Sequence, residues 1–342
     1  MFESASNPQH ANWIVRLVCL ALAVALGWGL VVLVRMTHMP LRSFKGPLPP
    51  LTPEQANLAF RLTGDVKSLS ATIGERNLQQ LQSLHASADY IRRSLEQFGY
   101  EVADLPYSIE GEQASNLEAR LAGTEAGAGE IIVGAHYDSV AGCVGADDNA
   151  SGVAAVLELA RVLRGSKLRR TVRFVLFANE EPPYFQTEAM GSVVYARQLH
   201  REGVRVSAMM SLEMLGYYSD KLGSQKYPPL LNLFYPREGN FIAFVGNSES
   251  RELVRRAIRE FRGTARFPSE GIAAPADLPG IGWSDQWSFW QEGYLAIMVT
   301  DTALFRYPHY HTSRDTVDKL DFEKMARVVD GVRHVVEALS KE

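Results

Sequence analysis

Short apolar runs alternate with amphipathic stretches along most of the chain, and together they predict a succession of strands and helices. Four runs are rich in β-branched, aromatic or other apolar residues and have the length of buried strands: residues 131–135, 171–178, 206–212 and 295–301. Near-continuous apolar runs of this kind are typical of parallel strands that are covered on both faces. Amphipathic spacing predicts helices over residues 77–98, 153–163 and 322–339.

These elements predict an α/β fold. Because strands and helices alternate, we expect right-handed crossovers around a mostly parallel, twisted central sheet with helices on both faces. Residues 100–109 and 115–121 precede the alternation and are expected to form antiparallel edge strands. An insertion rich in tyrosine and proline, residues 217–240, interrupts it. We interpret the insertion as a cleft wall or lid, with plain surface packing as the alternative.

One apolar run, residues 17–34, predicts a membrane anchor. It carries no charge, is bounded by Arg16 and Arg35, and at about 1.5 Å per helical residue it nearly matches the hydrocarbon core of a bilayer. A cleavable signal peptide is the alternative, but its apolar region usually spans only about 7–15 residues. We therefore expect one uncleaved N-terminal transmembrane helix. It divides the chain into an N-terminal tail, the anchor, a proline-rich linker and one folded domain, at residues 1–16, 17–34, 35–54 and 55–342.

Composition narrows the class of protein. The chain has 342 residues, of which 46% are hydrophobic and 22% charged, enough for one large domain with a sizeable core. Its formal net charge of −4 argues against a nucleic-acid partner. Its two cysteines, Cys19 and Cys143, exclude a disulfide framework. No glycine-rich phosphate loop stands out. These features are those of a folded enzyme or binding domain attached to a membrane.

Acidic and histidine residues gather where the predicted strands end. The adjacent carboxylates of Glu180 and Glu181 follow the strand at 171–178, and like charges in a cleft need a cation, a shared proton or solvent. An exposed pair in a loop would be the simple alternative. Other candidates follow the remaining strands or precede the helix at 153–163: His136, Asp138, Asp147, Asp148, Glu213, His309 and His311. Since open α/β sheets bind ligands at the carboxyl ends of their strands, this pattern favours a metal site there.

The order of these residues resembles that of the co-catalytic zinc aminopeptidases, whose relatives include bacterial leucyl aminopeptidase, glutamate carboxypeptidase and glutaminyl cyclase. The resemblance covers about residues 70–340. It is carried by five motifs in order: His136-x-Asp138, Gly145-Ala-Asp-Asp-Asn-Ala-Ser-Gly152, Asn179-Glu-Glu181, Leu212-Glu-Met214 and His311-Thr-x-x-Asp315-Thr316.

The resemblance implies two zinc ions bound by five side chains. The implied metal ligands are His136, Asp148, Glu181, Glu213 and His311. Asp148 would bridge the ions, with His136 and Glu213 on one ion and Glu181 and His311 on the other. Nitrogen and carboxylate ligands also suit Co²⁺ or Mn²⁺.

The resemblance also implies roles for neighbouring residues. Glu180 would be the general base, and Asp138 would orient the imidazole of a metal ligand. Asp285 resembles an aspartate that supports the site, although Gln286 stands where relatives carry histidine. Glu213 is a second departure, because many relatives carry the shorter aspartate there.

Two choices between similar residues follow from the family pattern. It favours Asp148 over Asp147 as the bridge, and His311 over His309 as a ligand, with His309 on the cleft wall or the surface. It also implies a cis peptide bond between Asp148 and Asn149.

The activity implied by the resemblance is hydrolysis of peptide bonds, and we expect an aminopeptidase that removes N-terminal residues. The alternatives are a glutaminyl-cyclase-like acyl transferase, which typically uses one metal, or a carboxypeptidase on the same scaffold. A non-enzymatic binding domain is disfavoured because no implied ligand is missing.

The implied partners are a peptide substrate and a membrane. Arg35, Arg42 and Lys45 follow the predicted span and only Arg16 precedes it, which would keep the domain in the cytoplasm by the positive-inside rule. Relatives with such a leader resemble secreted hydrolases, so we expect a single-pass protein with an extracytoplasmic catalytic domain. Substrate preference, the choice between amino- and carboxy-terminal trimming, and oligomeric state stay open.

Overall fold

The structure, a computed structural model, describes residues 8–341 and divides by its contacts into two units, residues 1–38 and 39–342. The first unit holds helix α1, Pro8–Thr37, which contains the predicted anchor. Among the described residues one helix, over Val15–Thr37, is long and apolar enough to cross a membrane, a property that a signal sequence near the N-terminus shares. Residues 1–7 of the predicted tail lie outside the described residues.

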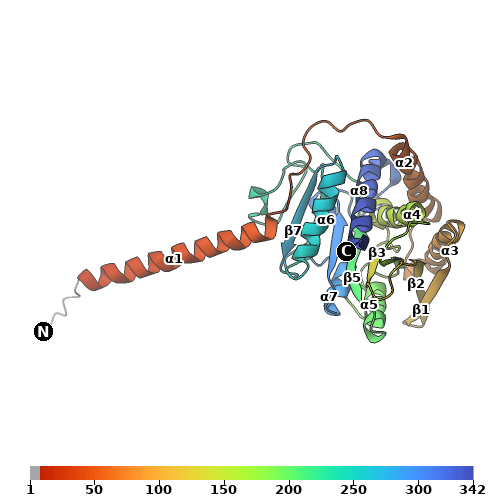
Figure 1. Ribbon diagram of the computed structural model, residues 1–342, viewed down its shortest axis with the longest axis horizontal. Coiled ribbons are helices and arrows are strands. Elements are labelled where there is room, and N and C mark those ends of the chain that lie inside the picture. Colours follow the sequence, from red (N-terminus) through yellow and green to blue (C-terminus); the bar gives the residue numbers. More distant parts are fainter. Residues whose placement is uncertain (1–7, 342) are drawn as a thin grey trace. The chain divides into compact units, whose positions relative to one another are not determined.

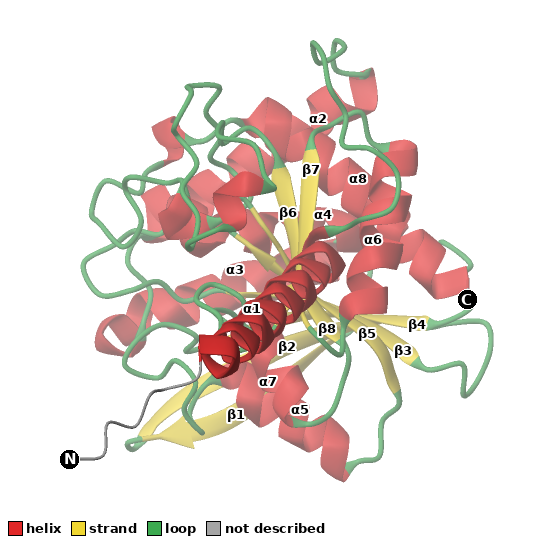
Figure 2. Ribbon diagram, turned by 90° about the vertical axis from the view of Figure 1, so that its left-hand side faces the viewer, coloured by secondary structure: helices red, strands yellow, loops and turns green. Residues whose placement is uncertain are grey.

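In the second unit eight strands form one mixed sheet with helices packed against it (Figure 1). The strand order is β1-β2-β4-β3-β5-β8-β6-β7. The strands are β1 Val102–Ile109, β2 Glu112–Leu121, β3 Glu130–His136, β4 Thr171–Phe177, β5 Val206–Glu213, β6 Ile242–Asn247, β7 Ser269–Ala274 and β8 Ala296–Thr300. Figure 2 shows the strands fanning out, as expected for a twisted sheet.

The centre of the sheet is parallel and one end is antiparallel, which confirms the predicted fold class. Strands β4, β3, β5 and β8 run parallel to one another, while β1 pairs antiparallel with β2 and β2 antiparallel with β4. The other end of the sheet does not continue the parallel pattern, because β6 pairs antiparallel with β8 while β7 is parallel to β6. The short β7, which contains Gly271, lacks the apolar signature of the other strands.

Helices cover both faces of the sheet, and alternate strand residues face each layer. Ile131 and Val133 belong to the larger core, whereas Ile132 between them packs with Phe177 and Phe289 in a second, smaller core on the opposite face. The larger core includes residues of α2, α3, α4, α6 and α8, and the smaller one residues of α5 and α7. These helices are α2 Pro53–Val66, α3 Leu81–Gln97, α4 Gly152–Leu163, α5 Gly191–Arg201, α6 Arg251–Thr264, α7 Gln286–Gln291 and α8 Phe322–Lys341.

Most of the predicted linker belongs to the second unit. Met39 is buried, and Arg262 of α6 donates to the carbonyls of Pro40 and Leu41, each at 3.1 Å. Further on, Pro49 accepts a hydrogen bond from Arg327 of α8. The proline-rich segment therefore lies along the second unit.

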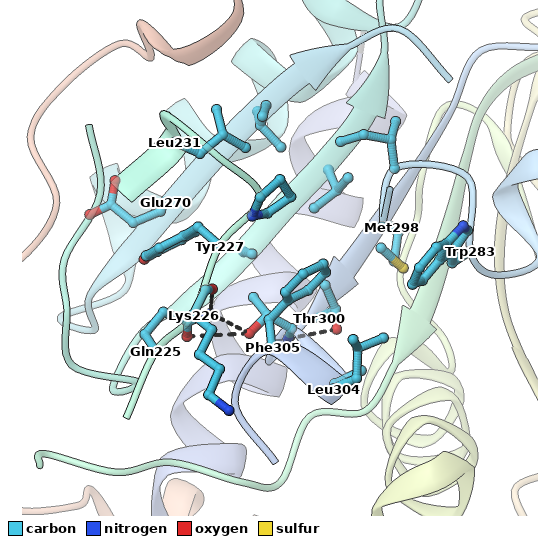
Figure 3. A pocket seen from close by; sticks show the side chains of 18 of the residues that line it. Gln225, Lys226, Tyr227, Leu231, Glu270, Trp283, Met298, Thr300, Leu304 and Phe305 are labelled. Atoms are coloured by element: carbon cyan, nitrogen blue, oxygen red, sulfur yellow. Dashed lines mark hydrogen bonds between the residues drawn. The ribbon is translucent and has the colours of Figure 1, made fainter. Parts of the chain in front are cut away.

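The insertion at residues 217–240 forms one wall of an apolar pocket beside the sheet edge (Figure 3). The pocket has a volume of about 110 Å³. Alternate residues of β6 and β8 form its floor, and Glu213 at the end of β5 lies at one side. The floor residues are Ala243, Val245, Met298 and Thr300. This placement agrees with the interpretation of the insertion as a cleft wall.

A partly buried carboxylate joins α2 to α3. Tyr90 of α3 donates to Asp65 Oδ1 at 2.6 Å. Burial, together with the nearby charge of Glu158, raises the pKa of Asp65 to about 6, against the lowering effect of the hydrogen bond from Tyr90. Because the pKa of Asp65 is higher in the folded state than in the unfolded state, its protonated form favours folding. This stabilisation is complete below the unfolded pKa of 3.8 and is lost as pH rises through about 6.

We expect Asp65→Asn to raise the free energy of unfolding at pH 8 by about 1–2 kcal/mol, because it removes the cost of a buried charge while keeping an acceptor for Tyr90. The gain should shrink towards zero below pH 4. Urea unfolding of the full chain in detergent at pH 4, 6 and 8 measures it. An equal gain at all three values would contradict the assigned titration.

Candidate metal centre

The carboxyl ends of the parallel strands bring the predicted residues together at one edge. His136 is the last residue of β3 and Glu213 the last of β5, while Glu180 and Glu181 follow β4. His311 lies in the loop after β8. Asp148 reaches the same place from the turn that precedes α4. One sheet edge therefore presents side chains from five segments that are far apart in the sequence.

The first group of donor atoms comprises His136, Asp148 and Glu213. His136 Nε2 lies 3.2 Å from Glu213 Oε2 and 3.5 Å from Asp148 Oδ1. His136 is fully buried, and neither of its ring nitrogens has a hydrogen-bond partner among the described residues. A buried imidazole nitrogen aimed at two carboxylates without such a bond suits a metal ion between them.

The second group comprises Asp148, Glu181 and His311. His311 Nε2 lies 3.1 Å from Glu181 Oε2 and 3.2 Å from Asp148 Oδ2. Asp148 therefore belongs to both groups and turns one carboxylate oxygen towards each histidine. That is the arrangement of a bridging carboxylate.

The spacing of the donor atoms fits zinc. Ligand atoms at about 2.0–2.1 Å from a tetrahedral ion lie about 3.3–3.4 Å apart. The four separations between histidine nitrogens and carboxylate oxygens in the two groups range from 3.1 to 3.5 Å. Each group supplies three protein donors, which leaves a tetrahedral position open for water or substrate. The residues present could thus hold two ions.

The buried carboxylates of the site would be stabilised in their ionised form by positive charge. Burial and the nearby charge of Asp148 together raise the pKa of Glu181 to about 7. Burial opposes the protonation of His311, yet its contacts with Asp148 and Glu181 raise its pKa to about 10. Burial likewise raises the pKa of Glu180 far above its usual range. Bound divalent cations would supply this positive charge and keep the carboxylates ionised.

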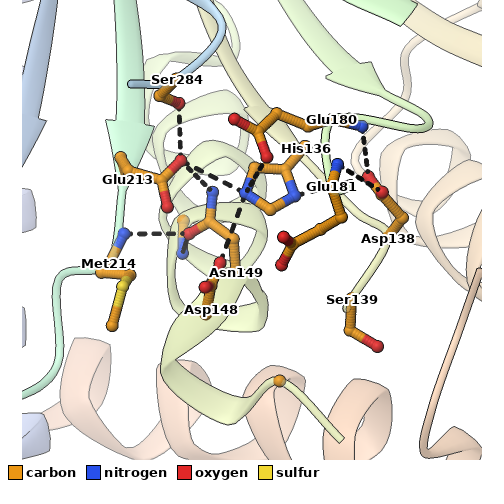
Figure 4. Close-up of polar contacts among 12 residues, drawn as sticks. His136, Asp138, Ser139, Asp148, Asn149, Glu180, Glu181, Glu213, Met214 and Ser284 are labelled. Carbon is orange, nitrogen blue, oxygen red and sulfur yellow. Dashed lines mark hydrogen bonds and ion pairs between the residues drawn. The ribbon is translucent and has the colours of Figure 1, made fainter. Parts of the chain in front are cut away.

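Asp138 connects one histidine to the glutamate pair (Figure 4). Its Oδ1 accepts from the backbone N–H of Glu180 and its Oδ2 from that of Glu181, each at 3.1 Å. The same carboxylate lies 3.4 Å from His136 Nδ1, on the ring side opposite the donor group. Asp138 thereby fixes the backbone of Glu180 and Glu181 and lies beside the imidazole, and its role in orienting the ring stays a prediction.

Glu213 is held by residues that the sequence did not single out. Ser284 Oγ donates to Glu213 Oε2 at 2.6 Å, and Asn149 Nδ2 approaches the same oxygen at 3.4 Å. Asn149 also donates to the carbonyl of Leu212 and accepts from the backbone N–H of Met214. The Asp148–Asn149 peptide bond is cis, as the family resemblance implies.

Asp315 and Arg76 fix the acidic loop. Asp315 accepts from the backbone N–H groups of Asp147 and Asp148 at 2.9 and 3.1 Å. The guanidinium of Arg76 is fully buried, and burial lowers its pKa. It donates to three loop carbonyls at 2.5 to 2.8 Å, those of Tyr137, Val144 and Gly145. In the sequence, Asp315 belongs to the last of the five motifs, whereas Arg76 belongs to none of them.

The remaining candidates lie outside the donor groups. Asp147 turns away and accepts from the backbone N–H of Gly216. His309 packs edge-on against Tyr307. The carboxylate of Asp285 is buried and has no hydrogen-bond partner among the described residues, and its support of the site stays a prediction. Gln286 donates to a backbone carbonyl outside the site.

An α/β sheet that carries two such donor groups at its carboxyl edge defines a class of proteins, the metal-dependent hydrolases. More particularly, residues 116–336 match the model of the family described as "Peptidase family M28". The chain belongs to this family and is a hydrolase that acts on peptide bonds.

The alignments with curated relatives cover most of the chain. YfbL of Escherichia coli (strain K12) is 39% identical over 292 residues, which cover 83% of this chain and 88% of that protein. A probable leucine aminopeptidase of Trichophyton verrucosum (strain HKI 0517) is 27% identical over 76% of this chain and 72% of its own length.

Solved structures share the fold. BSAP, a zinc aminopeptidase from Bacillus subtilis, aligns with a TM-score of 0.67 at 14% identity over 83% of this chain and 95% of its own. A glutaminyl cyclase from Porphyromonas gingivalis aligns with a TM-score of 0.60 at 20% identity over 82% and 98%.

We expect Arg76→Met to lower the free energy of unfolding by about 3–5 kcal/mol, because it leaves buried carbonyls and the carboxylates of Asp138 and Asp315 without their cation. Arg93→Met, at an exposed arginine of α3, is the matched control and should change it by less than about 0.5 kcal/mol. Urea unfolding of the full chain in detergent compares the two. Similar values for both variants would show that Arg76 does not organise the loop.

Proposed function

We propose that the chain is a di-zinc aminopeptidase that removes N-terminal residues from peptides. The observation that carries the proposal is the double contact of Asp148, whose two oxygens face His136 and His311 from opposite sides. In this assignment Glu213 completes the first ion's ligands and Glu181 completes the second's. The same donors would also accept Co²⁺ or Mn²⁺.

Glu180 is the proposed general base. It belongs to neither donor group, yet its Oε2 lies 3.9 Å from His136 Nε2, so its carboxylate borders the first group. The bound ions would lower the pKa of a water molecule and polarise the scissile carbonyl. Glu180 accepts the proton of that water and later donates it to the leaving amine. Asp138 fixes the backbone of Glu180, which keeps the base in reach.

The pocket lies directly beside the donor groups. Glu213 belongs to the first donor group and also lines the pocket, so a residue whose side chain enters the pocket would have its backbone next to the donor groups. The pocket beside them is mostly apolar, with Trp283, Met298 and Phe305 among its walls. It suits the side chain of an apolar N-terminal residue. The names of the leucine aminopeptidase relatives agree with this preference.

A glutaminyl-cyclase-like acyl transferase is the second candidate, because a glutaminyl cyclase shares the fold. That reaction joins the α-amine of an N-terminal glutamine to its own side-chain carbonyl carbon and releases ammonia, so it needs no hydrolytic water. Two complete donor groups favour hydrolysis.

We also propose that α1 stays attached as a single-pass anchor and that the catalytic unit lies outside the cytoplasm. The apolar window of this helix is not buried against any described residue, so a lipid environment would remove its leucines from water. Protease added to intact cells should then digest the catalytic unit.

Glu180→Gln should lower kcat by about 10²–10⁴ while zinc stays bound, because the amide keeps the volume of the side chain and loses the proton acceptor. Turnover of leucyl-p-nitroanilide and zinc content by elemental mass spectrometry measure the two effects. Unchanged turnover would remove Glu180 from the mechanism.

The zinc content of the wild-type chain separates the two candidate reactions. We expect about two ions per chain, with loss of hydrolysis on chelation and its return on adding zinc. A stable content of one ion, together with cyclisation of an N-terminal glutamine peptide and no hydrolysis, would favour the acyl transferase.

Ala243→Phe should lower kcat/KM for leucyl-p-nitroanilide by about 10–10²-fold and change it little for the alanyl substrate, because the new ring fills the pocket floor. The alanyl substrate is the internal control for folding and metal content. Equal losses for both substrates would show that the pocket does not select the N-terminal residue.

A further inference from the structure

The chain that follows α1 is fixed to the edge strand β7. Met39 is only 7% exposed and lies over Gly271, where an added Cβ would come within 3.0 Å of Met39 Cγ. Ser43 Oγ accepts from the backbone N–H of Ser269, and Arg262 holds the carbonyls of residues 40 and 41. One residue, His38, therefore separates α1 from a segment that is bound to the catalytic unit.

This connection limits how far β7 can be from a bilayer that α1 spans. If the hydrocarbon ends near Val34, before the charge of Arg35, three helical residues and two further residues lead to Met39. They span at most about 12 Å. The headgroup layer on each side of the hydrocarbon is itself about 5–7 Å thick. Whatever the angle between the two units, the β7 edge then lies at the lipid surface.

The insertion brings exposed leucines to the same edge. Tyr235 Oη donates to the carbonyl of Gly271 at 2.7 Å, which fixes the turn at residues 228–235 beside β7. On this turn Leu230 is 58% and Leu233 73% exposed. Single exposed leucines are common on soluble proteins, but these two lie on the short turn that is tied to the anchored strand.

Positive side chains accompany the leucines. Arg42 and Lys45 are exposed in the segment that covers β7, and Arg266 is exposed in the loop that leads into this strand. Leu41 of the covering segment is 58% exposed as well. Apolar side chains with cations around them are the combination that binds the interfacial layer of an anionic bilayer.

We propose that the turn at residues 228–235 rests on the lipid bilayer, with Leu230 and Leu233 inserted among the headgroups and acyl-chain ends. The proposal depends on α1 staying attached as an anchor and is independent of the reaction. Leu231 and Tyr235 of this turn line the apolar pocket, so one wall of the pocket would be supported by lipid. Peptides held at the membrane surface would reach the site beside this wall.

A fluorescent label tests the proposal in the full chain, reconstituted into nanodiscs of phosphatidylcholine and phosphatidylglycerol. Leu233→Cys in a Cys19→Ser background is labelled with an environment-sensitive dye, which leaves only the buried Cys143. Phe60→Cys is the matched control, because Phe60 is an apolar residue with 80% exposure on α2. In Figure 1, α6 and α8 lie between β7 and α2.

We expect spin-labelled lipids to quench the dye at position 233 about threefold more than the dye at position 60, with a blue-shifted emission at 233 only, since interfacial side chains lie about 5–10 Å deep. Leu230→Cys should repeat the result and guards against a local effect of one substitution. Equal, weak quenching at 230, 233 and 60 would overturn the proposal. So would an intact mass showing that residues 1–38 are removed.

Discussion

The folded catalytic unit depends on one electrostatic constraint, the gathering of buried carboxylates at a single sheet edge. Asp148, Glu180, Glu181 and Glu213 are each at most 6% exposed, and in the absence of cations burial alone would drive most of them towards the neutral form. Two histidines face them and carry the raised pKa values that such a surrounding produces. The parallel strands make this concentration of charge unavoidable, because their carboxyl ends meet at one edge. The surrounding loops are arranged to support it.

Backbone N–H groups and one arginine hold these carboxylates in place. Asp138 accepts from the backbone N–H groups of Glu180 and Glu181, and Asp315 accepts from those of Asp147 and the bridging Asp148. The guanidinium of Arg76 donates to three backbone carbonyls of the loop between β3 and α4. Asn179 and His311 have positive φ values of 56° and 54°, a conformation that non-glycine residues rarely adopt. Strain of this kind, within or next to the donor groups, is consistent with a site whose geometry matters more than local stability.

Much of this arrangement could be predicted from sequence. The four central strands carried clear apolar runs, and the ordered motifs picked out the residues that the fold then brings together. The remainder depends on contacts between distant segments. Asn149 and Ser284 are uncharged residues whose roles arise only when their loops meet at Glu213. Arg76 lies 61 residues before the carbonyl of Tyr137 that it binds, with nothing local to mark it. The strands β6 and β7 were not predicted individually because a glycine interrupts the apolar pattern of each, Gly246 in β6 and Gly271 in β7.

The covering of β7 has a consequence for how copies of the chain behave beside one another. An edge strand offers unpaired N–H and C=O groups to any strand that approaches it. Proteins tethered in one membrane share an orientation, so their edges would meet in register far more often than in free solution. Here the residues after α1, together with Arg262 and Tyr235, already occupy groups of Ser269 and Gly271. If α1 stays embedded in the membrane as proposed, the segment that follows it covers the edge that anchoring would otherwise present to neighbouring copies.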